Sequence, residues 1–270
     1  MWHLFRFFYF CSVKIKEAIR ALENFAPLPL QEDYDNAGLQ IGLTERELSG
    51  ALLCLDVTET TVSEAVAKGC NLIVAHHPLL FRGLRCVSDA DYVQRTVRAA
   101  ILHDVAIYAA HTNLDNARGG VNFRAAQMLG LQAPRFLRQQ PGGEGGSGVV
   151  GNLREPLSAD AFLQLLKSTF QAQHAEVNHC HKTQIRRVAF CGGAGDFLID
   201  DAVRAEADAF VTGEVGYHRF FGYNDTLLIA ALGHHDSEYH AAQLLCDILQ
   251  QACPDVPRYI AERQPPTHIV

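Results

Sequence analysis

The sequence predicts an α/β protein of two interleaved α/β lobes, with largely parallel sheets and a metal site in the cleft at the strand carboxyl ends. Three observations carry this prediction. Short continuous apolar runs alternate with amphipathic segments, the pattern of strand, helix, strand units. A glycine-rich stretch divides the chain near its middle. Histidines and acids recur directly after the predicted strands, where open α/β sheets bind their ligands.

Composition and charge are those of an ordinary globular chain. Of the 270 residues, 48% are hydrophobic and 20% are charged, which allows a substantial core in one large or two smaller domains. The formal net charge of -7 argues against broad binding to nucleic acid or to an anionic membrane. The eight cysteines form no CxxC pair, and several, such as Cys54, lie in apolar runs. This usage is typical of reduced thiols, so we expect a cytoplasmic protein.

Residues 1–12, MWHLFRFFYFCS, form an apolar and aromatic leader. Arg6 interrupts the leader, which is too short to span a bilayer and lacks the small-residue cleavage site of a signal peptide. We expect it to be disordered or not native to the domain, which would then begin near Val13. An ordered extension is the alternative.

The first lobe is predicted over residues 13–135. Apolar residues at helical spacing and nearby breakers, such as Pro27 and Gly69, define its helices. These predicted helices span residues 14–25, 60–68 and 90–103. The predicted strands span residues 52–55, 72–75 and 105–110, with a further short strand in DYDNAGLQIG. Because helical crossovers join them, the strands should pair in parallel.

A linker and a second lobe follow. The glycine-rich residues 136–150 are expected to form a flexible linker, and residues 151–262 the second lobe. The predicted helices of this lobe span residues 157–170, 197–205 and 238–252. Its predicted strands span residues 187–191, 209–212 and 227–231. The final helix belongs either to this lobe or, if the chain crosses back, to the first lobe.

The candidate metal ligands all follow predicted strands. In NLIVAHHPLLF, His76 and His77 end a buried strand, and Pro78 turns the chain away. In HTNLD, Asp115 follows the next strand. A lone histidine pair would more often be a solvent-facing turn, but the convergence of several donors at one sheet edge favours a metal site.

The motif GHHDSE supplies the remaining donors. His234 and Glu238 are four residues apart and would share one helical face, which suits two ligands of one metal. His235, three residues before Glu238, is the second choice. The competing interpretation is a surface loop in which Asp236 or Ser237 caps the last helix.

Counting these donors favours two ions. Adjacent residues at a strand end project in different directions, so His76 and His77 are better placed to serve two ions than to chelate one. The five donors are too few to saturate two separate ions, so a bridging carboxylate and a bridging water would complete a dinuclear site. Nitrogen and oxygen donors suit Zn, Fe, Mn, Co or Ni.

Other candidates carry less weight. Glycines after a strand could hold an anion with their amides, although GGAG lacks the spacing of a dinucleotide fingerprint. The NHCHK segment offers metal-capable atoms but is more typical of a polar surface strand, and three arginines near the motifs could contact phosphate or solvent. These residues are Gly192, Gly193, Gly195, His174, His179, Cys180, His181, Arg82, Arg85 and Arg118.

Six blocks together resemble one family, the dinuclear-metal proteins related to the NGG-interacting factor, often named GTP cyclohydrolase 1 type 2 homologs. The blocks are DYDNAGLQIG, NLIVAHHPLLF, HTNLD, RRVAFCGGAG, DAFVTGE and GHHDSE, and the resemblance covers roughly residues 13–259. It implies two α/β lobes, two divalent metals in the cleft between them and a ring-shaped homohexamer. The implied metal ligands are His76, His77, Asp115, His234 and Glu238. The chain resembles the short form without an inserted domain, and departs from the family in its leader and in Asp236-Ser237.

The resemblance also implies a function, hydrolytic opening of the guanine imidazole ring of GTP by a metal-bound hydroxide, with release of formate. A broader form of this hypothesis is the hydrolysis of another phosphate-bearing or cyclic substrate. Glu214, His111 and Asp35 are candidate proton carriers, and the sequence does not choose among them. The alternative is a non-catalytic metal-binding or scaffold protein, favoured by the lack of an Arg and Lys cluster matching a triphosphate.

Overall fold

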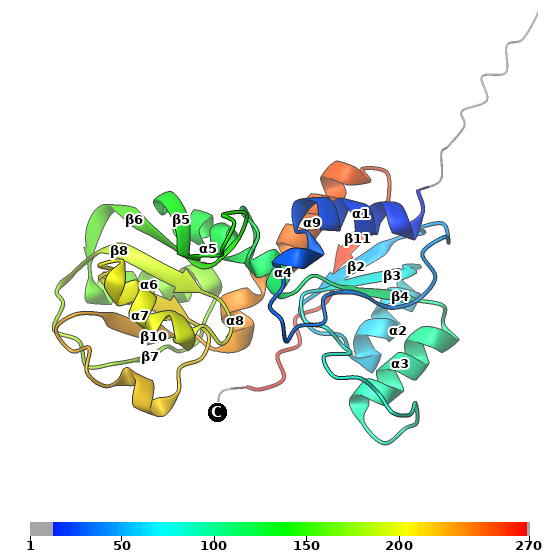
Figure 1. Ribbon diagram of the computed structural model, residues 1–270. Helices are drawn as coiled ribbons and strands as arrows, with labels where there is room; N and C mark the ends of the chain where they lie inside the picture. The colour runs from blue at the N-terminus through cyan, green and yellow to red at the C-terminus, as the bar shows by residue number, and fades with distance from the viewer. Residues whose placement is uncertain (1–12, 269–270) are drawn as a thin grey trace, which may run out of the picture.

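Two α/β lobes lie side by side in the computed structural model, which describes residues 13–268 (Figure 1). The mixed α/β class is therefore confirmed, whereas the predicted leader lies outside the described residues. The helices are α1 (Ile15–Phe25), α2 (Glu59–Ala67), α3 (Tyr92–Leu102), α4 (Thr112–Asp115), α5 (Val121–Met128), α6 (Ala159–Phe170), α7 (Ile199–Arg204), α8 (His234–Glu238) and α9 (His240–Ala252), with 3-10 turns η1 (Leu28–Leu30), η2 (Asp196–Leu198) and η3 (Tyr217–Phe220).

The first sheet has the strand order β1-β4-β3-β2-β11. Its strands are β1 (Gly38–Ile41), β2 (Ala51–Cys54), β3 (Leu72–Ala75), β4 (Ala106–Ala109) and β11 (Arg258–Ile260). All pairings are parallel except that of β1 with β4. Helices α1 and α9 cover one face and α2 and α3 the other.

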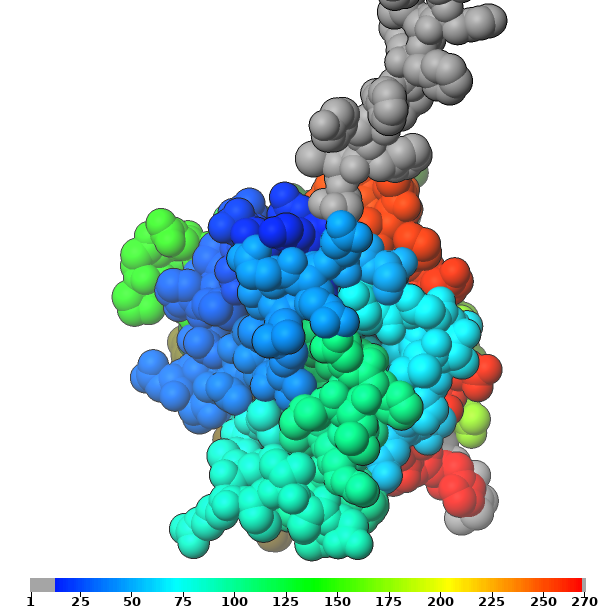
Figure 2. Space-filling model, turned by 90° about the vertical axis from the view of Figure 1, so that its right-hand side faces the viewer, coloured from blue at the N-terminus to red at the C-terminus, as the bar shows by residue number. Residues whose placement is uncertain are grey.

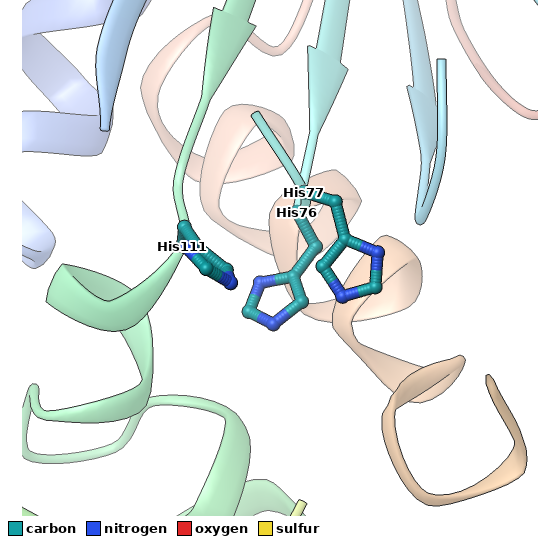
Figure 3. A group of neighbouring side chains, drawn as sticks. All are labelled: His76, His77 and His111. Atoms are coloured by element: carbon teal, nitrogen blue, oxygen red, sulfur yellow. The ribbon is translucent and has the colours of Figure 1, made fainter. Parts of the chain in front are cut away.

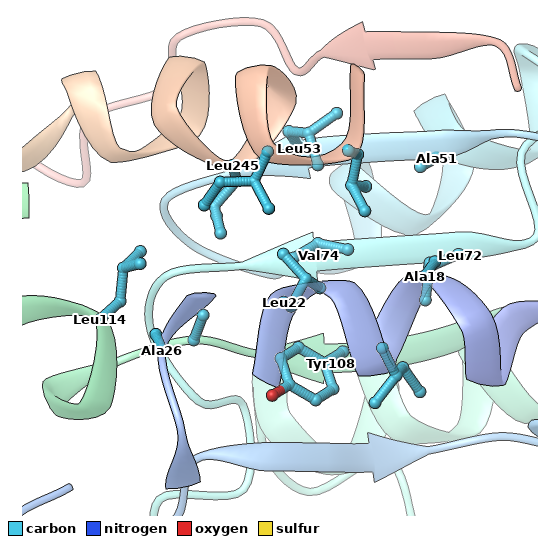
Figure 4. Close-up of a cluster of buried hydrophobic side chains, with 14 of the residues drawn as sticks. Ala18, Leu22, Ala26, Ala51, Leu53, Leu72, Val74, Tyr108, Leu114 and Leu245 are labelled. Carbon is cyan, nitrogen blue, oxygen red and sulfur yellow. The ribbon is translucent and has the colours of Figure 1, made fainter. Parts of the chain in front are cut away.

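Alternate side chains of each central strand feed these two layers. Leu53 and Val74 pack with Leu22 of α1 and Leu245 of α9, as Figure 4 shows. Ile73, from the same strand as Val74, faces the opposite layer. Burial on both faces explains why the strand sequences read as continuous apolar runs.

The second sheet has the order β5-β6-β8-β9-β10-β7. Its strands are β5 (Gln132–Gln139), β6 (Gly146–Ser158), β7 (Glu176–Val177), β8 (Gln184–Cys191), β9 (Ala209–Thr212) and β10 (Leu228–Ala231). Only β8, β9 and β10 pair in parallel, so the expectation of largely parallel sheets is wrong for this lobe. The antiparallel partners are the two hairpin strands and the short edge strand β7. Helices α5 and α6 cover one face of the sheet and α7 the other.

The glycine-rich segment is not a linker. Residues 132–139 and 146–158 form the antiparallel hairpin of β5 and β6, with Gly142 and Gly143 at positive φ in its tip. The glycines therefore close a tight turn. Next to this turn the hairpin contacts the first lobe, because the Gly146 N–H at the start of β6 donates to the Asn116 carbonyl at 3.1 Å.

The two lobes exchange segments at the C-terminal end of the chain. Helix α8 lies between the lobes, and α9 and β11 then pack into the first sheet. Figure 2 views the first lobe end-on, where the orange of α9 lies against the blue N-terminal segment. None of the helices within residues 13–268 has the length and apolar character needed to cross a bilayer.

Candidate metal centre

The histidine pair extends from the carboxyl end of β3. The His76 N–H donates to the Cys54 carbonyl at 3.1 Å and the His77 N–H to the Leu55 carbonyl at 2.9 Å, so β2 fixes both backbones. His76 is fully buried, whereas the side chain of His77 is 21% exposed. Figure 3 shows the two rings projecting from this strand end, with His111, which follows β4, on the side of His76.

The other donors come from short helical turns. Asp115 ends α4, which begins three residues after the end of β4. His234 and Glu238 begin and end α8, which begins three residues after the end of β10. A four-residue spacing places His234 and Glu238 on one face, and the His234 Nε2 atom lies 3.0 Å from Glu238 Oε2. Strand ends of both sheets therefore meet at one point.

Three groups of donors among the described residues could hold a metal ion, and two of them share Glu238. Of these two, the first set contains His77, His234 and Glu238, and the second set His76, Asp115 and Glu238. The third group contains His76, His77 and His111. Glu238 Oε2 lies 3.1 Å from His77 Nε2, whereas Glu238 Oε1 lies 3.8 Å from His76 Nε2. One carboxylate thus presents one oxygen to each set.

The second set contains a buried ring nitrogen that faces two carboxylates. His76 Nε2 is buried without a hydrogen-bond partner. It lies 3.6 Å from Asp115 Oδ1, and its 3.8 Å separation from Glu238 is likewise too long for a hydrogen bond. Buried polar atoms are rarely left unpaired, and an imidazole nitrogen facing carboxylate oxygens is a suitable donor set for a divalent cation. The residues present therefore fit a metal.

The electrostatics of the cluster favour positive charge. Burial lowers the pKa of His77, but hydrogen bonds to Asp56 and Glu238 raise it to about 10. The pKa of His76 is also raised, because the charges of Asp115 and Glu238 outweigh its burial. Burial raises the pKa of Asp115. Glu238 is also buried, but hydrogen bonds from the surrounding imidazoles hold its pKa well below the usual range. A bound cation would be stabilised by the same field.

Each imidazole is oriented by a second partner. The His76 Nδ1 atom lies 2.8 Å from the Ala110 carbonyl, the His77 Nδ1 atom 2.8 Å from Asp56 Oδ1, and the His234 Nδ1 atom 3.0 Å from Glu214 Oε1. A carbonyl or an ionised carboxylate requires the proton on Nδ1, so each Nε2 atom faces the cluster and would offer its lone pair to a bound cation. Sequence reasoning missed Asp56, although it follows β2 at the same sheet edge.

The proton-carrier candidates lie in different environments. The side chain of Asp35 is buried, accepts hydrogen bonds from Thr112, and contacts His111 Nδ1 at 2.7 Å. Burial raises the pKa of Asp35, but these hydrogen bonds lower it to about 2. An ionised Asp35 fixes the His111 proton on Nδ1, so His111 Nε2 is free to accept one. Glu214 is exposed and contacts His234.

The weaker candidates do not join the donor groups found among the described residues. His235 turns toward Asp236 at 3.3 Å and stacks on Tyr239. His181 pairs with Asp225 at 2.7 Å on the surface. The Gly192, Gly193 and Gly195 N–H groups donate to Asn122, Ser237 and Thr212, so these amides are not available to an anion. Arg118 packs over Phe123 and Phe136, and Arg82 and Arg85 are exposed.

Comparisons with known proteins agree with this architecture. Residues 13–265 match the profile of the Duf34/NIF3 (NGG1p interacting factor 3) family. The chain is 32% identical to the Clostridium perfringens GTP cyclohydrolase 1 type 2 homolog, over 84% of this chain and 87% of that protein. It is 30% identical to the Drosophila melanogaster NIF3-like protein 1, over 90% and 84%.

Solved structures share the fold. A Staphylococcus aureus hypothetical protein superposes with a TM-score of 0.88 at 24% identity, covering 96% of this chain and 100% of that chain. A Bacillus cereus protein related to NIF3 gives a TM-score of 0.86 at 24% identity, over 96% and 99%.

Proposed function

The chain belongs to the Duf34/NIF3 family, and from this premise we propose that it is a metal-dependent hydrolase with a dinuclear site. The proposed ligands are His76, His77, Asp115, His234 and Glu238. The observation that carries the proposal is the division of these donors into two sets, each facing a different oxygen of Glu238. Nitrogen and oxygen donors suit Zn, Fe, Mn, Co or Ni. Two such cations, when bound, would supply Lewis acidity and lower the pKa of water.

His111 is the proposed proton carrier. Its Nδ1 proton is held by Asp35, and the ring lies 5.4 Å from that of His76, measured between centroids. His111 Nε2 can therefore take a proton from a water beside the metal ligands. In this scheme Asp35 and Glu214 are positioning residues, for His111 and His234 respectively.

The names of the relatives suggest the reaction, which is opening of a guanine imidazole ring. One water adds to C8 and the C8–N9 bond breaks, so that the oxygen of the water becomes the formyl oxygen. One proton of this water passes to N7, and His111 carries the other to N9. A second water then cleaves the resulting formamide to formate and an amine. The free thiols among the described cysteines are consistent with a reducing, cytoplasmic setting. The proposed assembly is the homohexamer that the family resemblance implies.

Metal content and formate release test the proposal together. Protein reconstituted with each of the five metals should bind two ions per chain by elemental analysis and release formate from guanine compounds. We expect His111→Asn to retain the metal and to lose roughly 100-fold or more in rate. His218→Asn, on an exposed surface turn, and His235→Ala are matched controls with full metal content. Full metal occupancy without formate from any guanine compound would reject the hydrolase.

That outcome would favour the second candidate, a non-catalytic metal-binding or scaffold protein. One observation supports it. Two adjoining pockets form the cleft, one of about 230 Å3 beside Glu238 and one of about 310 Å3 beside Gln140. Arg138 is the only Arg or Lys among the described residues that line these two pockets, and it is already bound to Asp201. A triphosphate would therefore find no free cationic side chain on these walls.

A further inference from the structure

Two chambers adjoin in the cleft. The inner chamber, of about 230 Å3, is lined by metal-donor residues including Asp115, His234 and Glu238. The outer chamber, of about 310 Å3, lies beside the tip of the β5–β6 hairpin. The chambers share four lining residues, which form a throat between them. These throat residues are Glu32, Tyr34, Ser147 and Phe197.

Two aromatic side chains of the throat are exposed. Tyr34 from the first lobe is 66% exposed, and Phe197 from the second lobe is 45% exposed. Phe81 meets the Tyr34 ring edge-on at 6.5 Å, and the Arg138 guanidinium backs the Phe197 ring at 5.4 Å. Each ring thus packs against a neighbouring side chain on one side and is exposed to solvent on another. Such aromatic groups are suited to stack against a planar ring.

The charges around the throat oppose a polyanion. Glu32 stands in the throat, and Asp115 and Glu238 lie inside it. Burial raises the pKa of Tyr34, and the charges of Glu32, Asp35 and Asp115 raise it further, so the ring lies in a negative field. Arg138 donates from Nε to Asp201 at 3.0 Å, which neutralises the one cation of the outer chamber.

The outer chamber instead offers neutral polar groups. Gln139, Gln140 and Ser147 line it. Each amide already donates one hydrogen bond, from Gln139 Nε2 to the Gly143 carbonyl and from Gln140 Nε2 to the Leu30 carbonyl, so its oxygen and its second N–H remain. Amides and hydroxyls both donate and accept hydrogen bonds, so they match the hydroxyls of a sugar. A chain of phosphates would need cations, and the one arginine of this wall is already paired with Asp201.

We propose that the cleft binds a planar heterocycle between Tyr34 and Phe197 with a neutral hydroxyl-bearing tail in the outer chamber, that is, a nucleoside or free base rather than a nucleoside triphosphate. The inference rests on the proposed function for the chemistry, since the ring would then face the donors of the inner chamber. It goes beyond the proposed function because it assigns the class of substrate from the residues that line the cleft. Tyr34 and Phe197 are the specificity residues and Glu32 excludes the triphosphate.

Equilibrium binding to metal-free protein tests this inference without turnover. Calorimetric titrations would use guanosine, adenosine, their triphosphates and inorganic triphosphate. We expect at least one nucleoside to bind and its triphosphate to bind at least 10-fold more weakly. Tyr34→Leu and Phe197→Leu should each weaken nucleoside binding by roughly 5- to 100-fold, the range for loss of one stacking partner. Glu32→Gln should reduce the difference in affinity between the nucleoside and its triphosphate.

Tyr217→Leu is the matched control, because Tyr217 is an exposed aromatic outside the cleft and should leave binding unchanged. Thermal unfolding would show that the variants remain folded, as expected for exposed positions. Tighter binding of a triphosphate than of its nucleoside, no binding of either nucleoside, or unchanged affinity in both throat variants would overturn the inference. Metal content and formate release are measured separately, so such a failure would leave the proposed hydrolase standing.

Discussion

Gly193→Ala would test the placement of Glu238 with a single carbon atom. Gly193 follows β8 and has φ +61°, and its backbone lies against α8. A Cβ atom there would lie 2.3 Å from Glu238 Oε1 and 3.0 Å from Glu238 Cδ. Ordinary contacts of this kind begin near 3.4 Å, so the carboxylate would have to move by roughly 1 Å. Functional side chains tolerate about half of that displacement.

The expected losses separate into two terms. An alanine held in the left-handed region costs about 1–2 kcal/mol of folding stability. Displacement of the shared ligand should weaken metal binding by at least 100-fold, about 2.8 kcal/mol, because even changes to groups behind a ligand cost 10- to 100-fold. Metal titration with a competing chelator measures the second term, and denaturant unfolding of metal-free protein the first.

Gly130→Ala supplies the control. Gly130 has a similar φ of +69°, but no atom lies within 4 Å of an added Cβ. The control should lose the same 1–2 kcal/mol of stability and keep its metal affinity. Equal metal affinity in the Gly193 and Gly130 variants would refute the assignment of Glu238 as the shared ligand.

Three further predictions concern the same cluster. Asp115→Asn and His234→Ala should each leave one ion per chain, whereas Glu238→Gln should leave none; equal losses by elemental analysis in all three would contradict the division into two sets. Asp56→Asn should weaken metal binding 10- to 100-fold by releasing the His77 ring, measured by chelator competition. In metal-free protein the folded pKa of His77, about 10, exceeds the value of 6.5 of an unperturbed imidazole. Its contribution to stability is therefore complete below pH 6.5 and is lost as the pH rises through 10, a decline that unfolding titrations should find smaller in Asp56→Asn.

The sequence was informative about the site because the site follows one rule of topology. His76 and His77 end an apolar run that is buried on both faces, and Asp115 follows the neighbouring strand. Strand ends of a parallel sheet meet at one edge, so donors far apart in sequence could be placed together. The same rule applied to Asp56 after β2 would have found the partner of His77. A single acid after a strand also suits an ordinary turn or helix cap, so its role depended on a contact 21 residues along the chain.

The second lobe was less predictable for local reasons. Glycines in residues 142–146 are equally compatible with a flexible linker and with a hairpin turn. Only the pairing of β6 with β5 and with β8 distinguishes the two. Helix α5 is a short segment whose buried face is largely alanine, as at Ala125 and Ala126, so its apolar period is weak. The edge strand β7 has two residues, too few to show any period.

The crossing of α9 gives the metal centre a structural consequence. Glu238 lies where the chain leaves β10 of the second sheet and enters α9, which packs on the first. His77 and Glu238 are 161 residues apart and come from different lobes, yet their polar atoms are 3.1 Å apart. A cation bound by both would join the lobes at the cleft, and would stabilise the folded state in proportion to the logarithm of its concentration over its dissociation constant. If the proposed cations bind, the geometry that places two donor sets around one carboxylate would make metal occupancy and the relative position of the lobes interdependent. Because Tyr34 and Phe197 approach the throat from opposite lobes, the shape of the substrate cleft would depend on the same cations.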